Sequence, residues 1–247
     1  LHEQATEIYV QAIYQARQFA RQQIAQALQE QLVATYNRHN IQQVYAPVAD
    51  QIGRRGLKNA ALSYLMLVDN IGPELAWQQF NHADNMTDQA AALSALVNCP
   101  GAAAYAEQAL QQFEQQYRDE ALVMNLWLQI QATNSQPGGL QRVQALLQHS
   151  AFNMTNPNKI RSLIGAFCSA NLINFHSADG SGYKFLQEQI CALNSVNPQV
   201  AARLVTPLTR WKKFPEPNRQ LMRDALQNIG KQENLVKDLQ EIVTKSL

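Results

Sequence analysis

Apolar residues recur three and four positions apart along most of the chain, and no long stretch alternates with a period of two. This spacing places apolar side chains on one face of an α-helix. Two stripes show it most clearly, and they consist of Ile160, Leu163, Ile164, Phe167 and Cys168, and of Val200, Leu204, Val205 and Leu208. The pattern predicts a chain built from helices.

A further run is apolar nearly all round and predicts a buried helix; it contains Leu122, Met124, Leu126, Trp127 and Ile130. The complete pattern predicts helices over 3–36, 40–51, 57–69, 73–82, 87–98, 101–117, 121–133, 138–149, 157–170, 181–194, 198–210, 217–229 and 231–246.

Several helix starts carry local signals. Asn156-Pro157 and Asn197-Pro198 each combine a side-chain acceptor at the N-cap with a proline at the first helical position. Asn85 or Thr87 is the expected cap of the helix that follows. Asn174–Ser181, with its Asp179-Gly180 turn signal, is the longest segment expected to be irregular.

Short connections between many helices predict that successive helices pack as hairpins and that the hairpins stack. The expected fold class is all-α: an α/α superhelix, or irregular HEAT/armadillo-like solenoid. No regular tetratricopeptide or ankyrin consensus is present. Because no Gly/Ser linker or charge block divides the chain, residues 1–247 are expected to form a single helical domain.

Composition narrows the function classes. The net charge is +1, so no field of one sign would attract nucleic acid or an anionic membrane. No apolar run reaches the length of a membrane span. Cys99, Cys168 and Cys191 fit neither a disulfide framework nor a metal pattern, which favours a reducing, cytoplasmic location. We therefore expect neither nucleic acid nor a membrane as partner.

Familiar catalytic patterns are missing from the sequence. A zinc peptidase needs H-E-x-x-H on one helix, yet no two histidines lie four positions apart, and the His2-Glu3 pair is followed by Thr6 where histidine is required. There is no G-x-S-x-G elbow and no phosphate loop. Cys168 and His176 could form a nucleophile and a base, but Cys168 lies on an apolar stripe and is expected to be a buried thiol.

The segment Asn153–Leu186, NMTNPNKIRSLIGAFCSANLINFHSADGSGYKFL, resembles the C-terminal helical domain of bacterial aminopeptidase N proteins, which are M1-family zinc metallopeptidases. The resemblance extends from about Leu28 to the C-terminus and includes GLKNAALSYL and NMTDQAAALSAL. A start inside a helical pattern and the ending EIVTKSL are interpreted as those of a C-terminal fragment.

The resemblance implies a parent enzyme that removes N-terminal residues from peptides with one zinc ion. It implies that this domain closes over the catalytic domain of the same polypeptide, walls the peptide chamber and restricts access to it. The zinc ligands have no counterparts here, so this chain is expected to hold no cofactor and no catalytic group. Its surface should expose apolar area where the rest of the enzyme docks.

Three cations are candidates for contacts with peptide substrates. Lys159 and Arg161 follow Asn156 early in one helix, and Arg203 follows Asn197 early in another. Cations near a helix N-terminus interact unfavourably with the macrodipole, so a role in binding would explain why they lie there. Arg161 and Arg203 lie in the motifs NPNKIRSLIGAF and NPQVAARLVTPL, and the resemblance implies that they face the chamber. The alternative is a surface ion pair or a contact with a nearby carbonyl.

Two other classes of function stay open. The chain could be a free-standing helical-repeat scaffold that binds a protein partner, or an independent enzyme of unknown type. Trp211-Lys212-Lys213-Phe214 could form a small basic-aromatic patch for nucleic acid. The default for Trp77, Trp127 and Trp211 is packing in the core.

Overall fold

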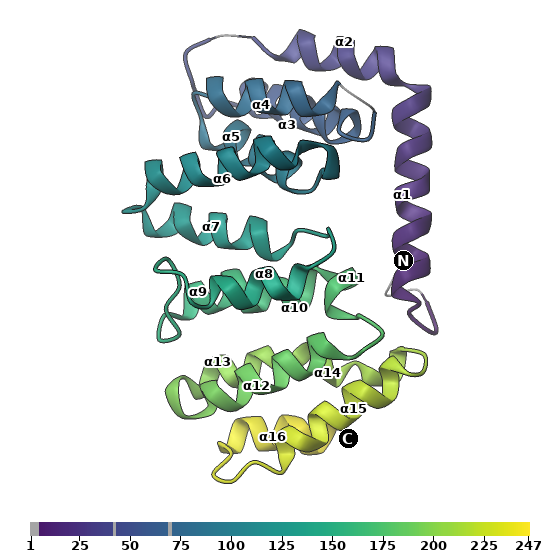
Figure 1. The fold of residues 1–247 in the computed structure, drawn as a ribbon, viewed down its shortest axis with the longest axis vertical. Helices are drawn as coiled ribbons and strands as arrows, with labels where there is room; N and C mark the ends of the chain where they lie inside the picture. Colours follow the sequence, from purple (N-terminus) through teal and green to yellow (C-terminus); the bar gives the residue numbers. More distant parts are fainter. Residues whose placement is uncertain (1–4, 42, 69–70) are drawn as a thin grey trace. The chain divides into compact units, whose positions relative to one another are not determined.

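The computed structural model describes residues 5–41, 43–68 and 71–247, and every regular element within them is a helix. The predicted all-α class is therefore confirmed for these residues. The chain groups into two compact units. Unit 1 comprises Leu1–Tyr14 and Gln131–Leu247, and unit 2 comprises Gln15–Ile130. Figure 1 labels the helices along the chain.

Unit 2 is a stack of helices in which chain neighbours pack on one another, α2 on α3, α4 on α5 and α5 on α6. Its elements are most of α1 (Val10–Ala27), α2 (Gln29–His39), α3 (Ala49–Leu65), α4 (Gly72–His82), α5 (Met86–Val97), the 3-10 turn η1 (Pro100–Ala102), α6 (Ala103–Tyr117) and most of α7 (Ala121–Ala132). Leu62, Leu93 and Phe113 are at most 1% exposed and belong to its core. Burying each such side chain contributes about 1.5–3 kcal/mol.

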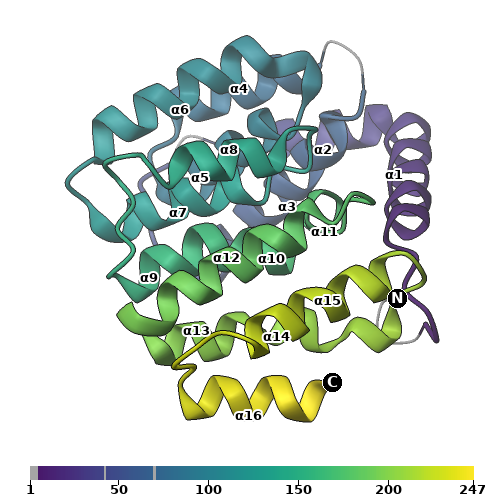
Figure 2. The ribbon, with the colours of Figure 1, turned by 60° about the horizontal axis from the view of Figure 1, so that its bottom comes forward.

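Unit 1 is a second helical stack, in which α12 packs on α13 and α15, and α16 packs on α13 and α15. Figure 2 shows α16 beside α14 and α15. Its further elements are α8 (Gly139–Leu146), α9 (Pro157–Ile160), the π-helical turn η2 (Arg161–Gly165), α10 (Ala166–Ala170), α11 (Leu172–Phe175), α12 (Ser181–Val196), α13 (Pro198–Leu204), α14 (Thr206–Thr209), the 3-10 turn η3 (Trp211–Lys213), α15 (Asn218–Gly230) and α16 (Lys237–Ser246).

The first described residues belong to unit 1 because they are held by its C-terminal half. The amide of Ile8 donates to the carbonyl of Lys213 at 2.7 Å. Arg219 Nη2 lies 2.6 Å from Glu7 Oε1. Ile8 itself is buried. A segment more than two hundred positions away in sequence thus completes the packing around η3 and α15.

The two predicted apolar stripes are confirmed, since all nine of their residues are buried. The prediction for α7 is only partly right. Met124, Trp127 and Ile130 are buried, whereas Leu122 is 80% exposed. Helical positions turn by about 100° per residue, so Leu122 lies on the side opposite Met124. The helix α7 is therefore buried on one side only, although apolar residues lie on both sides.

Two predicted helices near the N-terminus are wrong. The prediction 3–36 is divided at Leu28, where α1 ends and α2 begins, and residues 3 and 4 lie outside the described residues. Tertiary contacts explain this break, because α2 lies along α3 while Arg21 of α1 donates to the carbonyl of Ser63. The prediction 40–51 fails because Pro47 disfavours helix at the residue before it.

Instead of a helix, residues 43–48 form an irregular connection, and α3 runs from Ala49 to Leu65. Gln51 holds this connection. Its Oε1 accepts from the amide of Ala46 at 2.8 Å, and its Nε2 donates to the carbonyl of Val44 at 3.0 Å.

Further differences from the sequence prediction lie in the second half of the chain. The helix predicted over 198–210 is divided into α13 and α14 next to Pro207, which lacks a backbone donor. The helix predicted over 231–246 begins at Lys237, after a turn in which Asn234 has a left-handed φ of 59°. The non-helical stretch 147–156 is longer than 176–180, so the prediction of the longest irregular segment at 174–181 is wrong.

Candidate functional site

The helical run that carries Arg161 begins as the sequence predicts. Asn156 is the N-cap of α9, and its side-chain oxygen accepts from the amides of Asn158 and Lys159 at 2.9 and 3.4 Å. Pro157 follows at the first helical position. The cap satisfies amides that would otherwise lack a helical partner, and it fixes where the run starts.

Arg161 begins the π-helical turn η2 inside this run. Such turns are frequent at functional sites, and each inserts one extra residue into the helix. The Arg161 side chain is exposed, and its Nη1 donates to Asn158 Oδ1 at 3.2 Å. The neighbouring Ile160, Leu163 and Ile164 are buried. The core therefore holds this turn, while the guanidinium stays at the surface.

Arg203 occupies a comparable place on α13. Asn197 caps this helix by accepting from the amide of Val200 at 3.3 Å, and Pro198 follows the cap. Val200, Ala201 and Leu204 are buried, whereas Arg203 is exposed.

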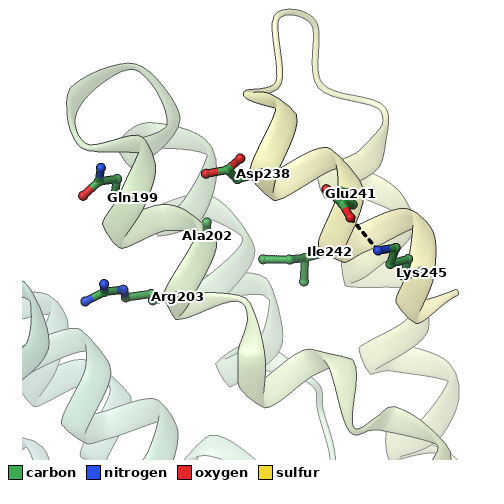
Figure 3. A pocket seen from close by; sticks show the side chains of 7 residues that line it. All are labelled: Gln199, Ala202, Arg203, Asp238, Glu241, Ile242 and Lys245. Atoms are coloured by element: carbon green, nitrogen blue, oxygen red, sulfur yellow. Dashed lines mark hydrogen bonds and ion pairs between the residues drawn. The ribbon is translucent and has the colours of Figure 1, made fainter.

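A groove of about 590 Å³ lies between α13 and α16. It is lined by Gln199, Ala202, Arg203, Asp238, Glu241, Ile242 and Lys245. Figure 3 shows Gln199 and Arg203 one turn apart on α13, with Ile242 of α16 pointing toward Ala202. Glu241 and Lys245 form an ion pair along α16. Among the described residues, neither the Arg203 guanidinium nor the Asp238 carboxylate is joined to another side chain by an ion pair.

The helical runs that carry the two arginines touch in unit 1 at Gly165 and Leu204. A methyl group placed on Gly165 would lie 3.7 Å from Leu204 Cδ2 and 3.9 Å from Arg161 Cβ. The end of η2 therefore packs against the end of α13. That both arginines act on one ligand stays a prediction.

Lys159 makes a different contact. Its Nζ donates to the carbonyl of Ala151, in the connection after α8. Partial burial lowers the pKa of this ammonium group from its usual value. The contact ties the start of α9 to the preceding connection, and a role for Lys159 in substrate binding stays a prediction.

A buried polar cluster in unit 2 was missed by sequence reasoning. Asp88 Oδ2 lies 2.7 Å from Lys58 Nζ, and both side chains are less than 10% exposed. Asn59 Nδ2 donates to Asp88 Oδ1 at 2.9 Å, and Gln79 Nε2 donates to the Asp88 carbonyl at 2.9 Å. Of the two predicted caps of α5, Asn85 rather than Thr87 is confirmed, because its side chain accepts from the amide of Asp88. The NMTD motif signalled this cap, but no sequence pattern linked it to Lys58.

Cys168 and His176 do not form the arrangement that catalysis would need. Cys168 is 1% exposed, and burial raises the pKa of its thiol well above the ordinary value. His176 Nδ1 instead lies 2.8 Å from the Tyr183 hydroxyl, which accepts from Asn218 Nδ2 at 2.6 Å. A thiolate is the reactive form of cysteine, so the predicted buried, inert thiol is confirmed.

The tryptophans behave largely as core residues. Trp127 and Trp211 are buried, and Trp77 is half-buried and stacks with Phe80 and Tyr105. Trp211 Nε1 donates to the carbonyl of Ser246 at 2.9 Å. Because Phe214 is buried as well, the Trp211–Phe214 segment offers no exposed aromatic ring on which a base could stack.

The described residues form neither a cluster of metal ligands nor a membrane-spanning helix. Within residues 5–41, 43–68 and 71–247, no three His, Cys, Asp or Glu side chains gather closely enough to hold a metal ion. These residues do not fit a zinc site, and the His2-Glu3 pair lies outside the described residues. None of the described helices has both the length and the apolarity needed to cross a bilayer.

Stacked helical hairpins with irregular repeats place this chain among the armadillo-type repeat proteins. It belongs to the family described as "Domain of unknown function (DUF3458_C) ARM repeats", whose model matches residues 1–247. The predicted fold class and the predicted resemblance are both confirmed.

Named relatives point to a particular group of enzymes. Aminopeptidase N of Escherichia coli (strain K12) is 41% identical over 237 residues, which are 96% of this chain and 27% of that protein. Aminopeptidase N of Haemophilus influenzae is 40% identical over 232 residues, which are 94% of this chain and 26% of that protein. The chain thus spans about a quarter of the length of these relatives.

A solved structure agrees with these relatives. The crystal structure of Legionella pneumophila aminopeptidase A in complex with aspartic acid matches with a TM-score of 0.90 and 28% identity. The match covers 99% of this chain and 29% of that one. Residues 1–247 are therefore a helical-repeat domain of aminopeptidase N-like proteins.

Proposed function

We propose that residues 1–247 are the C-terminal domain of a broad-specificity, M1-family zinc aminopeptidase that removes N-terminal residues from peptides. The domain closes over the catalytic domain of the same polypeptide, walls the peptide chamber and restricts access to it. It supplies no catalytic group, and the zinc ion belongs to the catalytic domain. The single observation behind this proposal is the match of nearly the whole chain to about a quarter of each aminopeptidase N.

Arg161 and Arg203 are the proposed contacts with the part of the peptide that lies downstream of the cleaved bond. Both guanidiniums are exposed, and the helical runs that carry them touch in unit 1 at Gly165 and Leu204. A guanidinium binds a carboxylate or a carbonyl through a fixed fork of donors. The groove beside Arg203 offers about 590 Å³ for the end of a short peptide.

Lys159 is the third proposed contact, and its role differs in kind. Its ammonium group already donates to the Ala151 carbonyl. A peptide carboxylate would have to compete with that carbonyl, so the expected contribution of Lys159 is smaller than that of either arginine.

Kinetics in the intact polypeptide test this assignment. Arg161→Ala and Arg203→Ala should each raise KM for tripeptides about 3- to 10-fold while changing kcat less, because they remove binding made in both the ground and transition states. An aminoacyl amide with no downstream residue should show no change in KM. Arg118→Ala serves as the control, since Arg118 is an exposed arginine of unit 2. Unchanged tripeptide kinetics in both variants would remove the two arginines from the proposal.

A reducing compartment such as the cytoplasm is the proposed location. Cys99, Cys168 and Cys191 form no disulfide. Cysteines persist as thiols mainly where glutathione and thioredoxin keep them reduced. Cell fractionation with an antibody against the chain would test this, and recovery in an oxidising compartment would contradict it.

A further inference from the structure

One face of α3 is exposed and carries no charge. Ile52 and Leu57 are 54% and 50% exposed, and Gly53, Gly56 and Ala60 lie exposed on the same face. These positions follow helical spacing, so they form one continuous strip, which we call the α3 face. The exposed ion pair of Asp50 with Arg54 borders this strip beside Leu57, whereas Lys58 lies on another side of the helix and is buried against Asp88.

Neither Gly53 nor Gly56 is required by the backbone conformation or by packing within the described residues. Neither has the positive φ that would require glycine, and no atom lies within 4 Å of a methyl group placed on either one. Glycine in a helix interior is less stable than alanine at the same position. Their presence is explained if a second backbone approaches closely, because small residues let helices approach one another.

Much of the rest of α3 is covered by other helices. It packs on α2, on α4 and on α5. The α3 face also continues into the connection before the helix, where Val44 and Val48 are exposed as well. In a solenoid, a terminal hairpin needs a polar outer face, and an apolar one is the surface on which the next hairpin stacks. The α3 face therefore has the character of a surface on which a further hairpin stacks.

We propose that the α3 face binds a helix of the same polypeptide that lies outside residues 1–247 and stacks as a further repeat. This inference rests on the proposed function, which makes the chain one part of a longer enzyme. The relatives provide such a length of chain, since the match covers only 27% of the E. coli protein. A shallow trough of Gly53 and Gly56 between Ile52 and Leu57 fits the ridge of a helix, because ridges of one helix pack into grooves of another.

Photo-cross-linking in the intact polypeptide tests the occupant. A benzophenone side chain at Leu57 should form an intramolecular cross-link to a helical peptide from outside residues 1–247. The same probe at Leu122, an isolated exposed apolar residue, should give no defined product. A Leu57 cross-link to a second copy, to residues within 1–247 or to the zinc-binding domain would overturn the proposal, as would no defined product.

A bulky substitution gives a second, independent readout. Gly56→Leu should lower the melting temperature of the intact polypeptide by several degrees and abolish the Leu57 cross-link. Ala104→Leu adds the same bulk at an exposed position of α6 and should change neither. A Gly56→Leu variant with an unchanged melting temperature and an intact cross-link would contradict the proposal.

The two proposals fail in different ways. An intact polypeptide with aminopeptidase activity and no helical cross-link would refute the α3 interface alone. A polypeptide without any H-E-x-x-H segment or peptidase activity would refute the proposed enzyme, whatever Leu57 contacts.

Discussion

The buried cluster of unit 2 and the open groove of unit 1 use the same types of charged side chain for opposite purposes. Lys58 and Asp88 pair at 2.7 Å inside the core, where Asn59 also donates to the carboxylate and Gln79 donates to the backbone carbonyl of Asp88. Arg203, in contrast, is exposed beside the groove and forms no ion pair with a described residue. The two buried charges depend on each other, because removal of one leaves the other buried and unpaired. A charge without an internal partner is available for a ligand.

The largest effect should come from breaking the buried pair. Asp88→Ala leaves the Lys58 ammonium buried without its counter-charge, and such changes cost about 3–5 kcal/mol. Asp238→Ala removes an exposed carboxylate and should change stability by about 0.5 kcal/mol or less. Urea unfolding of both variants measures the difference. Equal unfolding free energies would mean that the cluster and the groove do not differ as described.

A smaller effect should separate two glycines, one in each unit. A methyl group on Gly182 would lie 2.2 Å from the carbonyl oxygen of Phe175, so Gly182→Ala should cost about 1–3 kcal/mol. A methyl group on Gly56 meets no atom within 4 Å, so Gly56→Ala in residues 1–247 should stabilise the helix by about 0.5–1 kcal/mol. Thermal unfolding of the two variants tests the predicted loss of stability for Gly182→Ala and the predicted gain for Gly56→Ala. A stabilising Gly182→Ala would show that Phe175 does not lie against α12.

The smallest effect on stability at neutral pH comes from the ionisation of one buried tyrosine in each unit. Burial is the main cause that raises the pKa of Tyr36 and of Tyr183 to about 12. Because the folded pKa exceeds the usual 10, the stability from these phenols is complete below pH 10 and is lost as pH rises toward 12. Alkaline titration of tyrosinate absorbance should show groups that titrate near pH 12, and Tyr183→Phe should remove one of them. Full titration near pH 10 in the folded protein would contradict this.

Local sequence signals predicted the capped helices well. Asn85, Asn156 and Asn197 each accept from a backbone amide at a helix start, because a short polar side chain satisfies amides within its own next turn. The spacing of apolar residues predicted the buried stripes for the same local reason. Pro47 and Pro207 account for two of the wrong helix boundaries.

What the sequence could not predict depends on distant partners. The break at Leu28 has no glycine or proline beside it and follows from packing of α2 on α3. The pairing of Lys58 with Asp88 joins residues 30 positions apart. Arg161 and Arg203 lie in motifs that are visible in the sequence. The contact between their helical runs and the groove beside α16 could be seen only in the folded structure. The π-helical turn at Arg161 was not signalled by apolar spacing, which continues through it.

The central claim is that Arg161 and Arg203 bind the downstream carboxylate of a peptide, and peptides with and without that carboxylate test it most directly. In the intact enzyme, kcat/KM for a tripeptide with a free C-terminus should exceed that for its C-terminal amide by about 3- to 10-fold, as a charge-assisted hydrogen bond implies. The Arg161→Ala/Arg203→Ala double variant should lose this preference, and Arg118→Ala should keep it. A preference for the free carboxylate that survives in the double variant would contradict the account.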